Sequence, residues 1–166
     1  MTHIRSTVVR NASPARVKEL YHLARKQLGH DAHNVVDAIT LRHVGRYMFA
    51  RNFVAGLRTL DVACGSGYGS MILDNVASYQ GIDIDKTAIK TARRNFPGQA
   101  FTHGSIYSLP QSDGDVGAVT SFETLEHVDN PIAAIDEVAR VLTSSCSYSP
   151  GRVGLVPTHA GATTPL

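Results

Sequence analysis

Glycines and carboxylates follow two short apolar segments of this chain in an arrangement that could hold a nucleoside. The first segment carries Asp61 and runs into a loop that contains Gly65 and Gly67, and the second ends in acid at Asp83. Glycines adopt backbone conformations closed to other residues and let the backbone pass close to a ligand. An acid at the tip of the following strand can accept both hydroxyls of a ribose. These residues together predict a nucleoside pocket.

The spacing of the glycines bears on which nucleoside cofactor the pocket takes. The dinucleotide fingerprint Gly-x-Gly-x-x-Gly places a helix N-terminus against a pyrophosphate. Counted from Gly65, the third glycine of that fingerprint falls on Ser70, whereas Gly69 comes one position early. Asp61 would also set a negative charge near any phosphate. A cofactor with a cationic, amine-bearing end therefore fits these residues better.

The segment that begins at Asp61 resembles the first motif of the class I S-adenosylmethionine-dependent methyltransferases. That motif has the form (D/E)-x-G-x-G-x-G, and residues 61–67 read Asp-Val-Ala-Cys-Gly-Ser-Gly. Ala63 stands in place of the first glycine, a small change because alanine adds one methyl group to the loop wall.

The resemblance continues in order along the chain. Asp83 stands where the family has its ribose-binding acid, and residues 103–106 (His-Gly-Ser-Ile) stand where it contacts the adenine. Ser105 replaces the usual Asp there, although the backbone amide of Ile106 could still serve. Residues 115–128 look like the family's fourth strand and its Ser-x-Glu-x-x-Glu-His-Val continuation. Four motifs in order are more specific than one glycine loop.

The resemblance implies S-adenosyl-L-methionine as the cofactor and a small molecule as the methyl acceptor. It assigns cofactor binding to residues near the ends of the expected strands, namely Asp61, Ala63, Cys64, Gly65, Gly67, Asp83, Ile84, Ser105, Ile106 and Phe122. Cys64 is expected to be a small, buried loop residue rather than a nucleophile. Arg46 and Tyr47 could reach the cofactor's carboxylate, with ordinary packing as the favoured alternative.

Acids and a histidine after the fourth expected strand are the candidates for catalysis. Glu123 and His127 are the residues that we assign near the methyl group, and Glu126 lies between them. The Glu-x-x-Glu-His spacing is similar to that of O-methyltransferases for phenolic quinone precursors, in which such a cluster can hold a divalent metal. His127 could instead act as a base, since an unperturbed histidine titrates near neutral pH. In the alternative interpretation Glu126 and His127 only bond loop backbone or cap the next helix. We assign no metal site.

Alternating apolar segments and helical patterns make up the middle of the chain. They predict a Rossmann-like, doubly wound α/β fold with a mostly parallel sheet and helices on both faces. The expected strands are residues 58–63, 78–84, 100–102 and 116–122, and the expected helices are residues 68–75, a helix capped by Asp85 and one opened by Asn130 and Pro131. Asp61, Asp83, Ser105 and Phe122 lie at carboxyl ends of strands, where such sheets bind ligands.

Two helices are expected before this core. Ser13 and Pro14 start the first and Gly29 stops it, and the second covers residues 35–54. We therefore divide the chain into an N-terminal helical segment (residues 1–56) that covers the cofactor, and a core (residues 57–142). The simpler alternative is that these helices only pack on the sheet. The pair His30 and His33 is expected to be solvated.

Residues 143–166 differ from the rest in composition. They are mostly Ser, Thr, Gly, Pro and Ala, and Arg152 is the only Asp, Glu, Lys or Arg among them. The family usually continues directly into a fifth strand, which residues 149–157 echo several positions late. The alternative, which we favour, is a foreign or frameshifted tail. In either case the last strands of the usual seven-stranded sheet are missing, and the exposed edge of strand four offers a route to a homodimer.

The bulk composition is that of an ordinary protein domain. The chain has 166 residues, 43% hydrophobic and 18% charged, with a formal net charge of +2, so nothing indicates nucleic acid or membrane binding. It lacks a span-length apolar run and a signal-peptide core, and two cysteines make no disulfide framework, so we expect a cytoplasmic protein.

Two classes of function compete with methyl transfer. One is a non-catalytic or truncated methyltransferase fragment, and the other is an NAD- or nucleotide-sugar-binding domain, which would prefer a dinucleotide. A nucleic-acid methyltransferase would need an Asn/Asp-Pro-Pro-Tyr-type motif where residues 121–124 read Ser-Phe-Glu-Thr.

Overall fold

The computed structural model describes residues 35–143, with side chains from residue 41 onward. The expected helix between Ser13 and Gly29, the pair His30 and His33, and residues 144–166 lie outside the described residues. The elements in chain order are α3 (Val35–Val54), β1 (Arg58–Val62), α4 (Gly69–Ile72), β2 (Ser78–Asp83), α5 (Lys86–Asn95), β3 (Ala100–His103), β4 (Ala118–Thr120), the 3₁₀ turn η1 (Leu125–His127) and α6 (Pro131–Val141).

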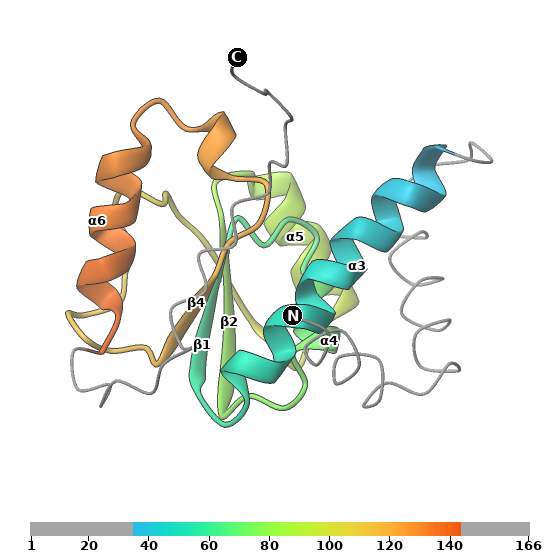
Figure 1. Ribbon diagram of the computed structural model, residues 1–166, viewed down its shortest axis with the longest axis horizontal. Coiled ribbons are helices and arrows are strands. Elements are labelled where there is room, and N and C mark those ends of the chain that lie inside the picture. Colours follow the sequence, from blue (N-terminus) through green and yellow to red (C-terminus); the bar gives the residue numbers. More distant parts are fainter. Residues whose placement is uncertain (1–34, 144–166) are drawn as a thin grey trace, which may run out of the picture.

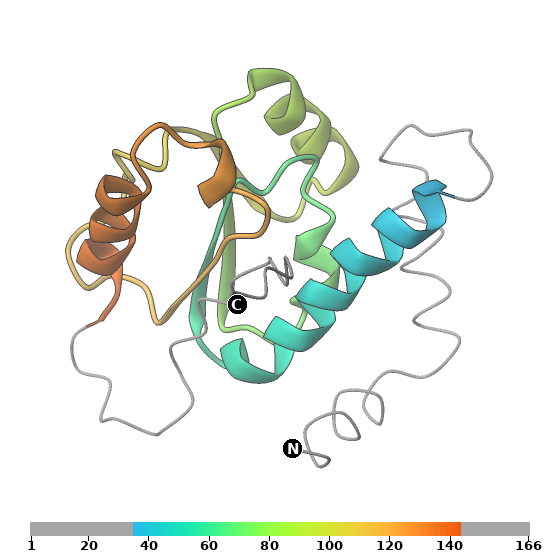
Figure 2. The ribbon, with the colours of Figure 1, turned by 45° about the horizontal axis from the view of Figure 1, so that its top comes forward.

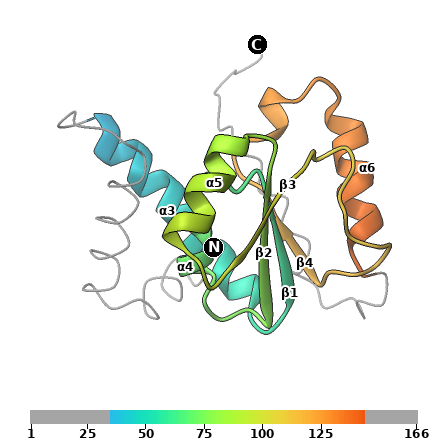
Figure 3. The ribbon, with the colours of Figure 1, turned by 180° about the vertical axis from the view of Figure 1, so that it is seen from behind.

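The four strands form a parallel sheet in the order β3-β2-β1-β4. Helix α6 covers one face of the sheet, and α3, α4 and α5 lie on the other (Figure 1; Figure 3 shows the same layers from behind). The order reverses between β1 and β4, which is the position where open sheets of this kind bind ligands. The predicted Rossmann-like α/β fold is thereby confirmed.

Each face of the sheet has its own apolar core. The core under α6 is formed by Leu60, Val62, Ile82, Leu109, Val116 and Val141. The core under the other helices includes Val44, Tyr47, Ala50, Val54, Ile72, Leu73, Ile89, Ala92 and Phe101. Buried positions of α3 recur every three or four residues, so this helix turns one stripe toward α4. No helix of the described residues is long and apolar enough to cross a membrane.

Two helix starts follow from the local sequence. The Asp85 side chain accepts the backbone N–H of Thr87 at the start of α5, at 2.7 Å. The Asn130 side chain accepts the N–H of Ala133 at 3.1 Å, with Pro131 as the first residue of α6. Both are capping residues that satisfy a backbone N–H left without a partner within the helix.

Strand β4 covers Ala118–Thr120 rather than residues 116–122, and Val116 before it pairs with the segment that follows α6. Val116 donates its N–H to the carbonyl of Val141 at 3.0 Å and accepts the N–H of Thr143 at 2.9 Å. Val116 and Leu142 form a parallel bridge. Parallel pairing of the kind expected of a fifth strand therefore begins directly after α6. Residues 149–157, where the sequence suggested a late fifth strand, lie outside the described residues.

Candidate functional site

The loop after β1 lies at the carboxyl-end edge of the sheet, which Figure 2 turns toward the viewer. Three of its residues have left-handed backbone conformations, with φ of 60° at Ala63, 55° at Gly65 and 82° at Gly67. Cys64 donates its N–H to the carbonyl of Ile82 at 3.0 Å, which ties the loop to β2. The backbone therefore turns sharply just where the sequence predicts the cofactor.

Gly65 and Gly67 have different reasons to be glycine. A Cβ at Gly65 would meet no atom of residues 35–143 within 4 Å, so this glycine borders space that a ligand can use. A Cβ at Gly67 would lie 2.6 Å from the ring of Phe101 and 2.8 Å from Cβ of Ala92. The missing side chain of Gly67 thus makes room for the core, and a contact of its backbone with the cofactor stays a prediction.

Asp83 joins the glycine loop to the end of β2. Its Oδ2 accepts the N–H of Gly65 at 2.8 Å, and its Oδ1 accepts the N–H of Asp85 at 2.8 Å. An ionised carboxylate has about four acceptor positions, so two hydrogen bonds leave capacity for further donors. The side chain is partly exposed. Its position beside Gly65 therefore suits an acid that accepts ribose hydroxyls.

Asp61 is buried behind the loop rather than exposed to a ligand. Its carboxylate accepts the hydroxyls of Tyr79 at 2.6 Å, Thr120 at 2.8 Å and Tyr47 at 2.9 Å. Burial raises the pKa of Asp61 to about 6, against the opposing effect of these hydrogen bonds. Its exposed fraction is 0%, so the structure shows only its internal partners, and a direct contact of Asp61 with the cofactor stays a prediction. It supports the loop from inside.

The hydroxyl donors around Asp61 were not identified from the sequence. Burial raises the pKa of Tyr47 and of Tyr79 well above the ordinary value, so both hydroxyls stay protonated and donate. Gly69 makes room for this arrangement, because a Cβ there would lie 2.4 Å from the Tyr47 ring and 2.8 Å from Oδ2 of Asp61. The only signal was the place of Tyr47 on the apolar stripe of α3, which predicts burial but no partner.

The residues expected around the adenine lie at the ends of β2 and β3. Asp83 and His103 are paired in register, and the ring nitrogen Nε2 of His103 lies 3.0 Å from the carbonyl of Ile84. The Ile84 side chain is 71% exposed, which is unusual for isoleucine at the end of a buried strand. Ser105 accepts the N–H of Tyr107 at 3.2 Å, and Ile106 packs on the core under α6. An apolar surface beside Asp83 is thus available to a base.

Cys64 is a packing residue, as the sequence predicts. Its side chain is 1% exposed, and a Cβ at Gly81 would lie 2.8 Å from its sulfur. Burial raises the pKa of the Cys64 thiol far above the usual range, so it does not ionise near neutral pH. Any contact of Cys64 with a ligand would come from its backbone.

Helix α3 and the segment after β4 meet on the same edge of the sheet. Glu123 forms an ion pair with Arg46 and has a φ of 53°, a conformation that costs energy for a residue with a side chain. The ring of Phe122 packs edge-on against Tyr47, with centroids 4.9 Å apart. Tyr47 thus packs on Phe122 and donates its hydroxyl to Asp61, while Arg46 forms an ion pair with Glu123. Both residues have partners within the protein, so no cofactor is needed to explain where they lie.

Glu126 and His127 are exposed on η1. The backbone N–H of His127 donates to the carbonyl of Thr124 at 2.9 Å. No hydrogen bond or ion pair joins Glu123 to His127 in the described part of the chain. Within residues 35–143, no three His, Cys, Asp or Glu side chains gather closely enough to hold a metal ion. The structure therefore does not assemble these three residues into one cluster.

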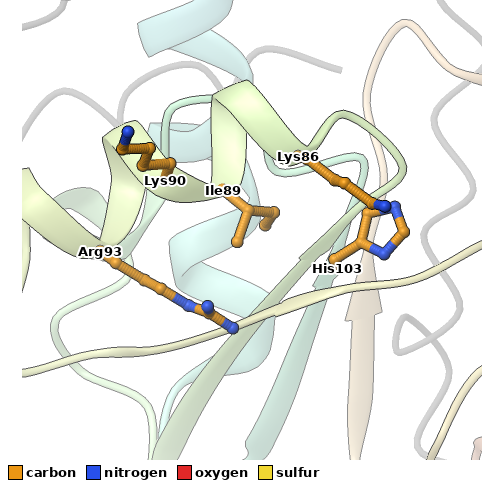
Figure 4. A pocket seen from close by; sticks show the side chains of 5 residues that line it. All are labelled: Lys86, Ile89, Lys90, Arg93 and His103. Carbon is orange, nitrogen blue, oxygen red and sulfur yellow. The ribbon is translucent and has the colours of Figure 1, made fainter.

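A basic pocket of about 370 Å³ lies between α5 and β3, lined by Lys86, Ile89, Lys90, Arg93 and His103. Figure 4 shows Lys86 directed toward His103, whereas Lys90 points away from both. Arg93 donates from Nε and Nη2 to the carbonyl of Phe101, at 3.0 and 2.7 Å. Because these cations diverge or are already bonded, we assign no ligand to this pocket.

Ala63 is expected to carry backbone strain that glycine would relieve. A left-handed conformation costs an L-residue about 1–2 kcal/mol, part of which glycine's greater unfolded-state entropy offsets. Ala63→Gly should therefore raise the free energy of unfolding by about 0.5–1 kcal/mol. Urea unfolding followed by circular dichroism measures this change. A loss of stability would show that the alanine methyl makes contacts that outweigh its φ of 60°.

Comparison with known proteins assigns the chain to one family. The family model described as "Methyltransferase domain" matches residues 60–147, more than half of the chain. A Mycolicibacterium smegmatis protein named "Probable S-adenosylmethionine-dependent methyltransferase" is 30% identical over 129 residues, covering 75% of this chain and 49% of that protein. A fatty-acid O-methyltransferase of the same organism is 35% identical over 94 residues, covering 54% of this chain and 34% of that enzyme.

A solved structure shares the fold. The YcgJ protein of Bacillus subtilis superposes with a TM-score of 0.56 at 25% identity, covering 61% of this chain and 46% of that protein. The chain spans about half or less of the length of the curated relatives described above. From the matched motifs, the parallel sheet and these relatives, the chain belongs to the class I S-adenosylmethionine-dependent methyltransferases, the family whose cofactor is S-adenosylmethionine.

Proposed function

We propose that this chain binds S-adenosylmethionine and transfers its methyl group to a small-molecule acceptor. The observation that carries the proposal is the junction of Asp83 with Gly65. A partly exposed carboxylate at the end of β2 holds the N–H of a glycine whose Cβ position faces open space. A nucleoside placed there meets both an acceptor for its ribose and a backbone without side chains.

The residues proposed for cofactor binding line this edge of the sheet. Asp83 would bind the ribose, and the exposed side chain of Ile84 would pack on the adenine. The loop backbone and the ends of the later strands supply the remaining proposed contacts, from Ala63, Cys64, Gly65, Gly67, Ser105, Ile106 and Phe122. Asp61 would act indirectly, by holding the loop. When bound, S-adenosylmethionine supplies a methyl group on a positively charged sulfur, which a nucleophile can displace in line.

Glu123 and His127 remain the candidates for proton removal from the acceptor. A base must come within about 2.6–3.2 Å of the atom that it deprotonates. Glu123 is bonded to Arg46, so it could act on an acceptor only after this ion pair opens or rearranges. His127 is exposed and bears no such restraint. The relative named a fatty-acid O-methyltransferase supports a small-molecule acceptor.

A second candidate is cofactor binding without methyl transfer. It is favoured by the engaged carboxylate of Glu123, which leaves the exposed His127 as the one unengaged candidate base of the two that we assigned. Turnover with a labelled methyl group distinguishes the two candidates. A cytoplasmic location, the absence of nucleic acid partners and a homodimer through the edge of β4 are further parts of this proposal.

Calorimetric titration with S-adenosylhomocysteine, with NAD as the competing ligand, tests the cofactor. We expect micromolar binding of S-adenosylhomocysteine and none of NAD. Asp83→Ala removes two hydrogen bonds from ribose to a charged group, at about 1.5–3 kcal/mol each, and should weaken binding at least tenfold. Because Asp83 also holds Gly65, Ile84→Ser is the more selective variant: an exposed side chain can be cut without unfolding.

Ile84→Ser should weaken the binding of S-adenosylhomocysteine by about fivefold or more. The urea midpoint of this variant should stay near that of the unmodified chain. Asp129→Ala, an exposed acid outside the site, is the matched control and should bind normally. Equal affinity for NAD, or no binding by a chain that circular dichroism shows to be folded, would contradict the proposal.

A further inference from the structure

One face of α3 lines a second pocket at the carboxyl-end edge of the sheet. Arg42, Gly45, Arg46 and Phe49 recur at intervals of three, four and seven residues, so they share a face of the helix. Together with Phe122 they line a cavity of about 310 Å³. This volume is at the lower end of the range for small-molecule sites.

Gly45 has no structural reason to be glycine. It lies in the interior of the 20-residue helix α3, where glycine destabilises relative to alanine. A Cβ at this position would meet none of the described residues within 4 Å, and its φ is not in the left-handed range. Within the described part of the chain, neither packing nor backbone conformation requires the missing side chain. Its effect is to leave the wall of the pocket open.

The pocket combines aromatic walls with positive charge. Phe49 and Phe122 supply the apolar surface, and Arg46 is neutralised by its ion pair with Glu123. Arg42 is exposed, and no acidic side chain of the described residues pairs with it. The half-buried His43 senses this charge: its pKa is lowered by burial first, then by Arg46 and Arg42, against the opposing effect of Glu123. The net charge offered to an occupant is therefore positive.

We infer that this pocket is the acceptor site and that it takes an organic acid with an apolar body, whose carboxylate is bound by Arg42. The planar guanidinium pairs with a carboxylate through two parallel hydrogen bonds. Phe49 and Phe122 then enclose the apolar part, over the gap that Gly45 leaves. This inference rests on the proposed function, because an acceptor site requires the methyl donor.

The competing occupant is the carboxylate of the cofactor itself, and one set of titrations separates the two. Decanoate is the probe, compared with decanol and decylamine, and each is titrated into the chain saturated with S-adenosylhomocysteine. The variants are Arg42→Gln, which removes the charge, and Gly45→Leu, which fills the cavity with a good helix former. Arg94→Gln, an exposed arginine of α5, is the matched control.

We expect decanoate to bind at least tenfold more tightly than decanol or decylamine. Arg42→Gln should reduce the affinity for decanoate to that for decanol. Gly45→Leu should abolish the binding of decanoate, and its urea midpoint should not fall. Both variants should bind S-adenosylhomocysteine as tightly as the unmodified chain does. Arg94→Gln should change neither the affinity for S-adenosylhomocysteine nor the affinity for decanoate.

Equal affinity for the three probes, or unchanged decanoate binding in Arg42→Gln, would overturn the inference and leave the proposed function standing. A tenfold loss of affinity for S-adenosylhomocysteine in Arg42→Gln would also overturn the inference, because it would assign the pocket to the cofactor's carboxylate. Failure of the unmodified, folded chain to bind S-adenosylhomocysteine would instead remove the proposed function, and the acceptor assignment with it.

Discussion

Asp61→Ala is expected to lower the free energy of unfolding by about 3–5 kcal/mol, because three buried hydroxyls would lose their shared acceptor. The carboxylate is fully buried and accepts hydroxyls from Tyr47, Tyr79 and Thr120. Alanine leaves these three donors without an acceptor in the interior, and each unsatisfied buried group costs about 1–3 kcal/mol. This cost is larger than the free energy that is regained because the variant no longer buries a carboxylate.

Urea unfolding followed by circular dichroism measures this loss. Asp113→Ala is the matched control, since its side chain is 82% exposed in an ion pair with Arg140. Such surface pairs contribute about 0–1 kcal/mol. A loss below about 1 kcal/mol in Asp61→Ala would mean that the hydroxyls find other partners, and that the carboxylate does not organise the loop.

Gly67→Ala and Gly65→Ala are expected to fail in different ways, although they lie two residues apart in one loop. At Gly67 the new methyl group would overlap the Phe101 ring and Ala92. Overpacking costs about 1–3 kcal/mol and the left-handed conformation about 1–2 kcal/mol, so we expect a loss of about 2–5 kcal/mol. At Gly65 only the conformational cost applies, because no atom of the structurally described residues lies within 4 Å of the added Cβ.

The two variants are compared by urea unfolding and by titration with S-adenosylhomocysteine. Gly65→Ala should stay folded with a loss of about 1–2 kcal/mol, and should bind the ligand at least tenfold more weakly because the methyl group enters its space. Gly67→Ala should lose more stability than Gly65→Ala does, so its main defect should appear in urea unfolding. If Gly65→Ala bound normally, the open space beside it would not be the cofactor site.

Patterns that lie close together in the chain predicted the alternating elements and their capping residues. Helix α3 covers residues 35–54 as expected, and Asp85 and Asn130 cap the helices that they were expected to start. Element type depends on the period of apolar residues and on caps within three positions, so it can be read locally. The same holds for the placement of Asp83 at the end of a strand.

The sequence by itself therefore determined the family, the order of strands and helices, and the edge of the sheet that carries the site. Only the tertiary structure decided what each site residue does. Asp61 takes its donors from positions 14, 18 and 59 residues away. The contrast between Gly65 and Gly67 depends on Phe101, and the pairing of Glu123 with Arg46 joins the segment after β4 to α3. A motif specifies residue types over a few positions, whereas burial and partners depend on which distant segments the sheet brings together.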